Sequence, residues 1–299
     1  MCEIIVPVVT VFDENEKPDF EQNKKVIDFL VEGGVDGILV LGSTGEFTVL
    51  DYEDKLQFAK DYYDYTNGRV DLYFGSNCPS FEDTLNLSNE AIKIGYKGVM
   101  VVGPYYYGTD DEKMTIYYDK LAKNVDGNIY IYNFPDRSGY SISPEAYRKL
   151  VLDNKNIVGL KDSVMEPLHT NRLCRATEDL GTKIYSGYDD QFLYNLSTGG
   201  SGCIGALSNL VPDIWSDLVK STREKDFDRM FKLSGLIHKL MPLYDLDSNF
   251  AHLFKRLMAL RGVDISSKST FPYDQLDEKV FEKGKKLLEK VIEEYRELK

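Results

Sequence analysis

The sequence contains few of the residues that hold metal ions or cross-link chains. It has only three histidines and four cysteines among 299 residues. The histidines form no HxxxH or HExxH pattern, so a protein metal site is not expected. The cysteines form no CxxC pair, which is typical of reduced thiols in a cytoplasmic protein. These residues are His169, His238, His252, Cys2, Cys78, Cys174 and Cys203.

Long apolar segments and an excess of basic residues are also missing. No stretch approaches the ~20 apolar residues of a membrane span. The start, MCEIIVPVVTVFDENEK, has no basic n-region, so we expect no signal peptide. With 36 basic and 49 acidic residues the formal net charge is −13, and we expect no binding to nucleic acid or to a membrane. An anionic substrate would need a local positive site.

The apolar residues occur in eight short runs with amphipathic segments between them. Several runs are rich in Val and Ile at consecutive positions, which is typical of strands buried on both faces of a parallel sheet. The runs are Ile4–Val11, Val35–Leu41, Val70–Phe74, Val99–Val102, Ile129–Tyr132, Ile157–Leu160, Ile184–Tyr185 and Cys203–Ala206. Hydrophobic residues make up 42% of the chain and charged residues 28%, as in ordinary globular proteins.

Helix signals fill the intervening segments. Asp19 precedes a helix that ends at Gly33, and Ser143 is an N-cap before Pro144. Ser80–Asp83 and Thr109–Glu112 resemble capping boxes. A further helix is expected over Asp190–Ser197. The last helices are expected over Asp213–Thr222, Asp226–Leu243, Ser248–Arg261 and Asp277–Leu298.

Alternation of strand and helix predicts an α/β fold, a (β/α)8 TIM barrel. We expect the catalytic barrel over residues 1–222 and a helical C-terminal extension packed on it over residues 223–299. A doubly wound parallel sheet is the competing architecture. Against it, no strand is followed by the GxGxxG phosphate turn.

Polar groups stand where barrel strands end, which is where barrel active sites lie. The second strand ends in GSTGE, Gly42–Glu46. Its glycines permit close backbone approach, and Ser43 and Thr44 add hydroxyl and N–H donors that could bind a small carboxylate. An ordinary βα turn would have the same composition, so this motif alone is weak.

The sixth strand ends in IVGLKDS, which carries Lys161. Desolvation at a barrel mouth favours the neutral amine of a lysine, which can attack a carbonyl and form a Schiff base. For an isolated lysine, snorkelling at a strand edge or pairing with Asp162 is the alternative. The fifth strand ends in Tyr132, whose phenol could relay protons beside Lys161. The fourth ends in GPYYYG, Gly103–Gly108, where packing explains at least two of the three tyrosines.

With these motifs the chain resembles the family of dihydrodipicolinate synthase and N-acetylneuraminate lyase, which are pyruvate-dependent class I aldolases. GSTGE, YNFP-x-x-SG and GLKD stand in the family's order and spacing, and the resemblance covers nearly all of the chain. It implies that Lys161 forms the Schiff base and that Tyr132 is the acid and base. It also implies that Ser43 and Thr44 hold the substrate carboxylate.

Further roles are implied by the same resemblance. Tyr106 resembles a tyrosine that completes a proton relay, often across a subunit interface. The backbone carbonyl of Ile204, in GCIGA, is expected to face bound pyruvate. No metal or organic cofactor is expected. Family members are commonly homotetramers, built as dimers of dimers.

The motifs for the second substrate disagree. Arg137, in YNFPDRSG, matches the arginine with which dihydrodipicolinate synthases meet aspartate semialdehyde. GYDD, with Gly187, Asp189 and Asp190, resembles lyases that bind sugar hydroxyls. Ser43 also favours a resemblance to these sugar-type lyases. So do YNFP, GLKDS and YDLDSNF (Tyr244–Phe250). Ala206 replaces the serine of sialate lyases, which counts against sialic acid.

We therefore expect a lyase that cleaves or forms a 2-keto-3-deoxy sugar acid or a related 2-oxo acid, with pyruvate and an aldehyde as its small-molecule partners. Dihydrodipicolinate synthase is the alternative, and a dehydratase branch of the family stays open. A non-catalytic paralogue that binds 2-oxo acids is the hypothesis from another class. Intact Lys161 and Tyr132 argue against it.

Overall fold

The computed structural model describes residues 2–298 and forms a (β/α)8 barrel, which confirms the predicted fold class. Its strands follow one another in chain order around a closed barrel, and the described pairings between named strands are parallel. The strands are β1 (Glu3–Pro7), β2 (Gly37–Val40), β3 (Asp71–Gly75), β4 (Gly98–Val102), β5 (Ile129–Asn133), β6 (Ile157–Asp162), β7 (Lys183–Ser186) and β8 (Gly202–Cys203).

The first and eighth strands end well before their predicted apolar runs do. The first ends at Pro7, although Val8, Val9 and Val11 are also fully buried. Val9 N–H instead donates to the Asn209 side chain, at 3.1 Å. The eighth ends at Cys203. Buried apolar residues therefore continue past both strands without continuing the sheet ladder.

The chain divides into two compact units. The first contains residues 2–3 and 71–205, and the second contains residues 4–70 and 206–298. Each unit combines segments that are distant in the sequence. The predicted division at residues 222 and 223 into a barrel and an extension stays a prediction.

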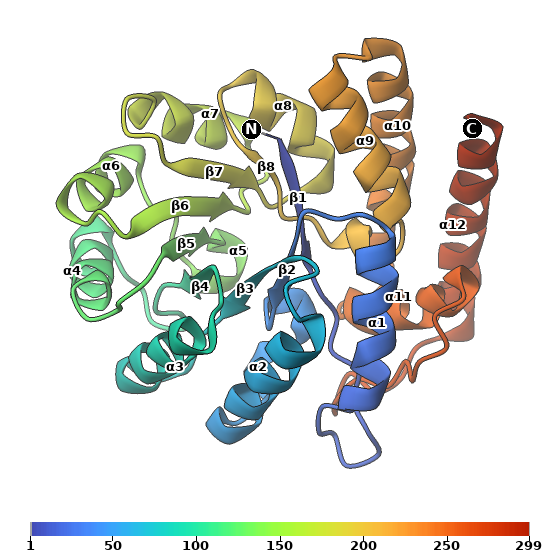
Figure 1. Ribbon diagram of the computed structural model, residues 1–299, viewed down its shortest axis with the longest axis horizontal. Coiled ribbons are helices and arrows are strands. Elements are labelled where there is room, and N and C mark those ends of the chain that lie inside the picture. Colours follow the sequence, from blue (N-terminus) through green and yellow to red (C-terminus); the bar gives the residue numbers. More distant parts are fainter. Residues whose placement is uncertain (1, 299) are drawn as a thin grey trace. The chain divides into compact units, whose positions relative to one another are not determined.

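In the first unit, helices lie on the outer side of strands β3–β7 (Figure 1). Asp110, and not Thr109, caps the helix after β4 by accepting a hydrogen bond from the Lys113 N–H, so the Thr109 capping box is wrong. A carboxylate one residue later is the acceptor instead. Ser80 and Ser143 cap their helices as expected. The elements are α3 (Phe81–Ile94), α4 (Asp111–Ala122), α5 (Pro135–Ser138), α6 (Pro144–Asp153), α7 (Pro167–Ala176), η3 (Asp189–Gln191) and α8 (Phe192–Ser197).

Tyrosines pack together in the interior of the first unit. The rings of Tyr73 and Tyr130 meet edge to face at 5.4 Å, and Tyr185 lies 6.4 Å from Tyr130. The Tyr185 hydroxyl donates to the Glu3 carboxylate at 2.5 Å, and Lys183 pairs with the same carboxylate at 3.2 Å. The Tyr185 hydroxyl thus has a charged acceptor inside the aromatic layer, as a buried phenol needs.

Gly202 allows β8 to pass close to Glu3, so Gly202→Ala is expected to destabilise the protein. A Cβ at Gly202 would lie 2.0 Å from the Glu3 carbonyl oxygen, and its φ of +139° disfavours side chains. We expect a loss on the order of 2–4 kcal/mol in the free energy of unfolding, measured by chemical denaturation. Gly108→Ala is the control, since nothing lies within 4 Å of its Cβ. Equal stability of the two variants would contradict this prediction.

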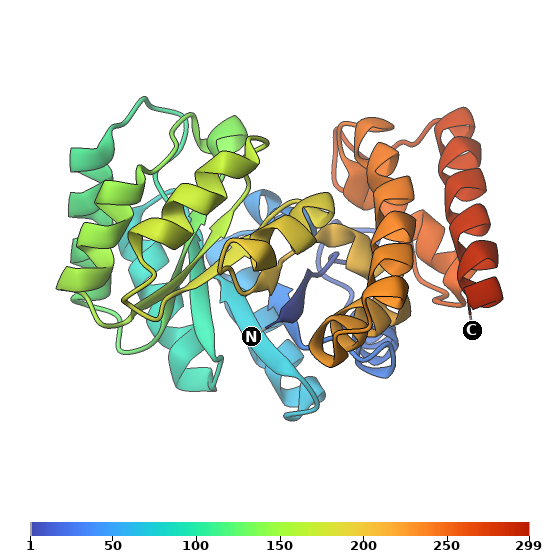
Figure 2. The same ribbon diagram turned by 90° about the horizontal axis from the view of Figure 1, so that it is seen from above.

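The second unit contains the remaining helices. Helix α10 packs against α9 and α12, and α11 packs against α12, as Figure 2 shows. The predicted C-terminal helices are confirmed, with short 3-10 turns at two of their ends. The elements are α1 (Phe20–Glu32), η1 (Ser43–Gly45), η2 (Phe47–Val49), α2 (Tyr52–Thr66), η4 (Ala206–Asn209), α9 (Pro212–Glu224), α10 (Phe227–Leu240), η5 (Met241–Asp245), α11 (Phe250–Met258), η6 (Ala259–Arg261) and α12 (Glu278–Leu298).

The four cysteines are free thiols, and all are buried. Among residues 2–298, no helix combines the length and the apolar character needed to span a bilayer.

Candidate active site

Lys161 and Tyr132 lie side by side on neighbouring strands. The sheet register pairs Tyr132 of β5 with Lys161 of β6. The Lys161 Nζ lies 4.4 Å from the centroid of the Tyr132 ring. Both residues are buried, with 5% and 7% exposure respectively. The expected juxtaposition of an amine and a phenol is therefore present, at the C-terminal ends of two parallel strands.

Aromatic contacts continue from Tyr132 toward α5, the short helix that carries Arg137. The rings of Tyr132 and Phe134 stack at 5.5 Å with 25° between their planes. The guanidinium of Arg137 lies 6.0 Å from the centre of the Phe134 ring. Arg137 belongs to α5 and is exposed, and within the described chain it forms no ion pair. Its guanidinium is thus available to an anion.

The GYDD segment packs onto the end of β6 and the turn after β8. A Cβ on Gly187 would lie 2.0 Å from the Ser163 Oγ, and one on Gly205 would lie 2.3 Å from the Asp189 Oδ1. The Asp189 carboxylate is therefore held against the GCIGA turn, where Ile204 donates its N–H to the Ser186 carbonyl at 2.8 Å. Asp189 is 2% exposed, whereas Asp190 is exposed.

Tyr188 is a polar group of this region that the sequence analysis did not assign to the site. Burial raises the pKa of Tyr188, and the nearby Asp136, Tyr132 and Asp190 raise it further. Its phenol therefore stays protonated at neutral pH and can donate a hydrogen bond. The signal in the sequence is the tyrosine of GYDD itself, which stands directly before the two acidic residues.

Cys203 is a buried thiol near Lys161, and its electrostatics argue against a role as nucleophile. Burial raises the pKa of Cys203 well above its ordinary value, Asp189 raises it further, and Lys161 opposes them. The thiolate is the reactive form of cysteine. Cys203 is thus a poor nucleophile at neutral pH.

In the second unit, GSTGE forms a tight turn. Gly45 N–H donates to the Gly42 carbonyl and Glu46 N–H to the Ser43 carbonyl, at 3.0 and 3.1 Å. Thr44 is buried with 5% exposure, whereas Ser43 is exposed. The Thr10 hydroxyl donates to the Gly45 carbonyl at 2.8 Å. These hydrogen bonds fix the backbone of the turn. A fixed backbone is needed if the N–H and hydroxyl groups of the turn are to act as positioned donors.

Tyr106 is not packed against Lys161 or Tyr132 in the single chain. Its side chain is 90% exposed, and its ring meets Tyr107 edge to face at 5.2 Å. Its φ of +80° is unusual for a bulky residue. The predicted part of Tyr106 in a proton relay stays a prediction.

Comparison with known proteins agrees with these observations. The model of the dihydrodipicolinate synthetase family matches residues 1–291. A protein of Escherichia coli K12 described as "Probable 2-dehydro-3-deoxy-D-pentonate aldolase" is 29% identical over 287 residues, which cover 95% of each chain. A 4-hydroxy-tetrahydrodipicolinate synthase of Kosmotoga olearia is 31% identical over 244 residues, which cover 81% of this chain and 82% of that one.

A solved structure agrees as well. The crystal structure of YagE, a prophage protein from Escherichia coli K12 determined in complex with pyruvate, superposes with a TM-score of 0.94 at 28% identity. The match covers 98% of this chain and 99% of YagE. The predicted resemblance and the predicted lyase class are confirmed, and the chain belongs to the dihydrodipicolinate synthetase family.

Proposed function

We propose that this chain is a Schiff-base-forming, pyruvate-dependent aldolase that cleaves or forms a 2-keto-3-deoxy sugar acid or a related 2-oxo acid. The observation that carries the proposal is the buried Lys161, whose Nζ lies 4.4 Å from the centre of the Tyr132 ring. An amine held in apolar surroundings beside a phenol has the two groups that imine chemistry needs, a nucleophile and a proton carrier.

In the proposed mechanism, the neutral Lys161 amine attacks the keto carbon of the 2-oxo acid. Tyr132 donates its phenol proton to the departing hydroxyl, and loss of water gives a protonated imine and a Tyr132 phenolate. The phenolate then accepts the proton of the C4 hydroxyl as the C3–C4 bond breaks. The bonding electrons move into the imine, which becomes an enamine, and the aldehyde leaves. Protonation of the enamine carbon and hydrolysis release pyruvate and restore Lys161. Condensation follows the same steps in reverse.

Other groups would bind the two ends of the substrate. Ser43 and Thr44 would donate hydrogen bonds to the carboxylate next to the keto group, as the family motif implies. Ile204 would face bound pyruvate through its carbonyl. Arg137, which has no carboxylate partner among residues 2–298, would meet a distal anionic or hydroxyl group. Asp189 and Asp190 would accept hydrogen bonds from sugar hydroxyls.

We also propose that the protein assembles as a homotetramer built from two dimers. The adjacent Tyr106 and Tyr107 side chains are 90% and 80% exposed. A pair of aromatic rings that is open to solvent in one chain can be covered by a second copy. Tyr106 would then reach a proton relay from across that interface.

A dihydrodipicolinate synthase is the second candidate function, and the exposed Arg137 favours it. The two candidates predict different reactions with pyruvate as the common substrate. Aldol products of pyruvate with glyceraldehyde and with aspartate semialdehyde should be quantified by mass spectrometry under equal conditions. We expect faster turnover with glyceraldehyde, and pyruvate release from 2-keto-3-deoxy sugar acids. Much faster turnover of aspartate semialdehyde would contradict the sugar-acid proposal.

Arg137→Leu is expected to weaken binding of the full 2-oxo acid substrate roughly ten- to hundredfold, which corresponds to ~1.5–3 kcal/mol. The reason is the loss of a charged contact to the distal end of the substrate. The measurement is kcat/KM for cleavage, with Arg137→Lys as the variant that retains charge. The rate of pyruvate adduct formation should not change, because pyruvate lacks the distal end. An unchanged kcat/KM for cleavage would show that Arg137 does not bind the substrate.

A further inference from the structure

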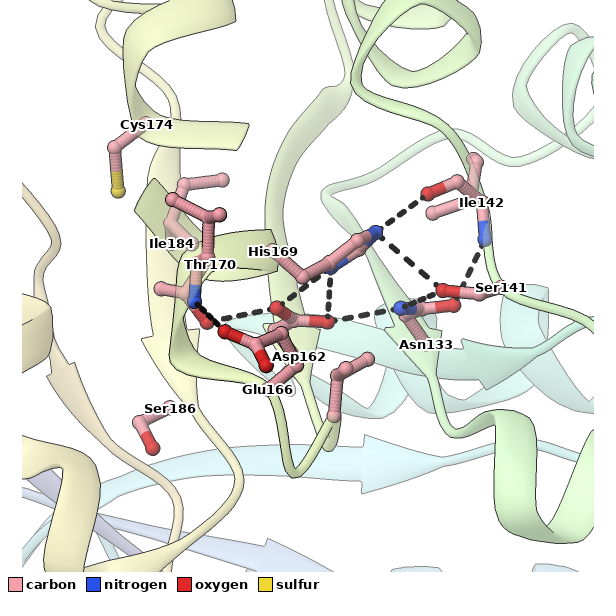
Figure 3. A network of polar contacts seen from close by, with 12 residues as sticks. Asn133, Ser141, Ile142, Asp162, Glu166, His169, Thr170, Cys174, Ile184 and Ser186 are labelled. Atoms are coloured by element: carbon pink, nitrogen blue, oxygen red, sulfur yellow. Dashed lines mark hydrogen bonds and ion pairs between the residues drawn. The ribbon is translucent and has the colours of Figure 1, made fainter. Parts of the chain in front are cut away.

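Asp162 follows Lys161 on β6 and is a buried carboxylate with several hydrogen-bond partners. Successive strand residues point to opposite faces, so Asp162 points away from the face that carries Lys161. Its side chain is completely buried. It accepts hydrogen bonds from Asn133 Nδ2 at 2.8 Å, from Thr170 Oγ1 at 2.7 Å and from His169 Nδ1 at 2.9 and 3.1 Å. Figure 3 shows these contacts around the carboxylate.

His169 faces an acceptor with each of its ring nitrogens. Nδ1 faces the Asp162 carboxylate, and Nε2 lies 3.0 Å from the carbonyl oxygen of Ile142. The Ser141 hydroxyl lies 3.4 Å from Nε2 and can orient either way. A carbonyl oxygen and an ionised carboxylate only accept, so His169 can donate to both only if both of its nitrogens carry hydrogen. The geometry therefore favours the imidazolium form, paired with Asp162.

The charges around His169 favour the same form. Burial by itself would lower the pKa of His169. The hydrogen bond and the negative charge of Asp162 act against burial, with help from the Ile142 carbonyl, and the pKa is raised above its ordinary value. Arg172, on the same helix α7, has a smaller opposing effect.

Asn133 closes these contacts into a ring. Its Nδ2 donates to Asp162, and its Oδ1 accepts the Ile142 N–H at 3.0 Å. Ile142 accepts from His169, and His169 donates back to Asp162. The ring joins the ends of β5 and β6, the start of α7 and the segment after α5 (Figure 3). Asn133 and Asp162 pair in the sheet register one step beyond Tyr132 and Lys161.

We propose that Asp162 and His169 are positioning residues, whose ion pair fixes the strand ends that carry Lys161 and Tyr132 and the short helix that carries Arg137. This inference rests on the proposed aldolase function. The ring does not include Lys161 or Tyr132, and it acts on them through the backbone of β5 and β6. A displacement of about 1 Å between reacting groups can cost ~10²-fold in rate, so a ring that fixes these strands has a measurable effect.

Loss of a proton from His169 opens the ring. A neutral imidazole has a single N–H, so it can donate to Asp162 or to Ile142 but not to both. Because the pKa of His169 is raised in the folded protein, protonated His169 makes its full contribution to stability just below the ordinary histidine pKa. This contribution is lost as pH rises through the folded-state pKa. The rate of imine formation should therefore fall over the same pH range.

The test compares wild type with His169→Gln and His238→Gln. His238 lies on α10 and is exposed, so it is the matched control. The measured quantity is the rate of pyruvate adduct formation. Samples are quenched with borohydride at each pH and at each pyruvate concentration. The chain has only three histidines, so NMR of the imidazole signals measures the pKa of His169 independently in the same samples.

We expect the wild type and His238→Gln to share a decline in rate that coincides with the titration of His169. His169→Gln should lack this decline and be roughly 10- to 100-fold slower at neutral pH. Its half-saturating pyruvate concentration should change less than its maximal rate. If His169 had a purely structural role, His169→Gln would be less stable. The adduct-formation rate of its folded molecules would then show the same pH profile as that of wild type.

Two results would overturn the inference. One is a folded His169→Gln with the rate and pH profile of wild type. The other needs no variant and applies even if His169→Gln does not fold: it is a wild-type rate that does not decline through the His169 titration. Wild-type protein that forms no pyruvate adduct at any pH fails differently, because it refutes the proposed function and this inference with it.

Discussion

Lys161→Met is expected to abolish turnover, with a loss of roughly 10⁴- to 10⁶-fold, the range seen when a catalytic nucleophile is removed. Methionine keeps much of the volume and the apolar stem of lysine but has no amine. It cannot form the imine that accepts the electrons of the broken carbon–carbon bond. Tyr132 alone can move protons but cannot supply this electron sink. The measurement is kcat for cleavage of a 2-keto-3-deoxy sugar acid that the wild type turns over.

Two controls separate chemistry from folding. Lys149→Met removes an amine from α6 whose side chain is 63% exposed, and we expect wild-type turnover. Lys161→Arg keeps a positive charge but supplies no usable nucleophile, because its guanidinium stays protonated. It should be as inactive as Lys161→Met. Substantial activity in a folded Lys161→Met would show that the reaction does not proceed through this amine.

Lys255→Met is expected to lower the free energy of unfolding by about 3–5 kcal/mol, the cost of breaking a buried ion pair on one side. Lys255 is in α11, and its side chain is completely buried. Its Nζ donates to Glu46 Oε1 at 2.8 Å and to the carbonyls of Thr10 and Lys268 at 3.1 and 2.6 Å. Burial lowers the pKa of Lys255, and Glu46 opposes this effect.

Glu46 makes the effect large because it is buried with 8% exposure and ends the GSTGE turn. It also accepts a hydrogen bond from Asn249 Nδ2 at 3.0 Å. Its φ of +54° lies in the left-handed region, so its backbone depends on side-chain contacts to keep this shape. Without Lys255, a buried carboxylate would lose its cation. Pyruvate binding should weaken as well, because the turn carries Ser43 and Thr44, which we propose hold the substrate carboxylate.

The double variant Glu46→Gln/Lys255→Met tests this explanation. When both charges are removed, no carboxylate is left buried without a cation. Chemical denaturation of both single variants and of the double variant gives the coupling free energy. We expect the double variant to be more stable than Lys255→Met. If the two destabilisations simply add, the buried pair is not the cause.

The sequence predicted those parts of the fold that depend on local patterns. Asp19 and Gly33 mark the ends of α1, and Ser143 with Pro144 marks the start of α6, as expected. These signals are local because caps and turns involve residues within one helical turn. The error at Thr109 is of the same kind: Thr109 and Asp110 are both good caps, and their order alone does not decide between them.

The contacts behind the site could not be predicted in the same way. Lys161 and Tyr132 were expected together, because each ends an apolar run and consecutive barrel strands are neighbours. Glu46 and Lys255 are 209 residues apart in the sequence, and no pattern indicates their pairing. His169 belongs to no metal motif, and the sequence alone suggests Asp162 only as a partner of Lys161. Tertiary packing alone reveals that the two form an ion pair.

The most direct test of the central claim is the site at which borohydride traps pyruvate on the wild-type protein. Folded enzyme is incubated with pyruvate, reduced, digested and mapped by mass spectrometry. We predict one added pyruvate-derived group per chain, on the peptide that contains Lys161, and none when pyruvate is left out. Folded protein that gains no such group, or gains it on another lysine, would contradict the account.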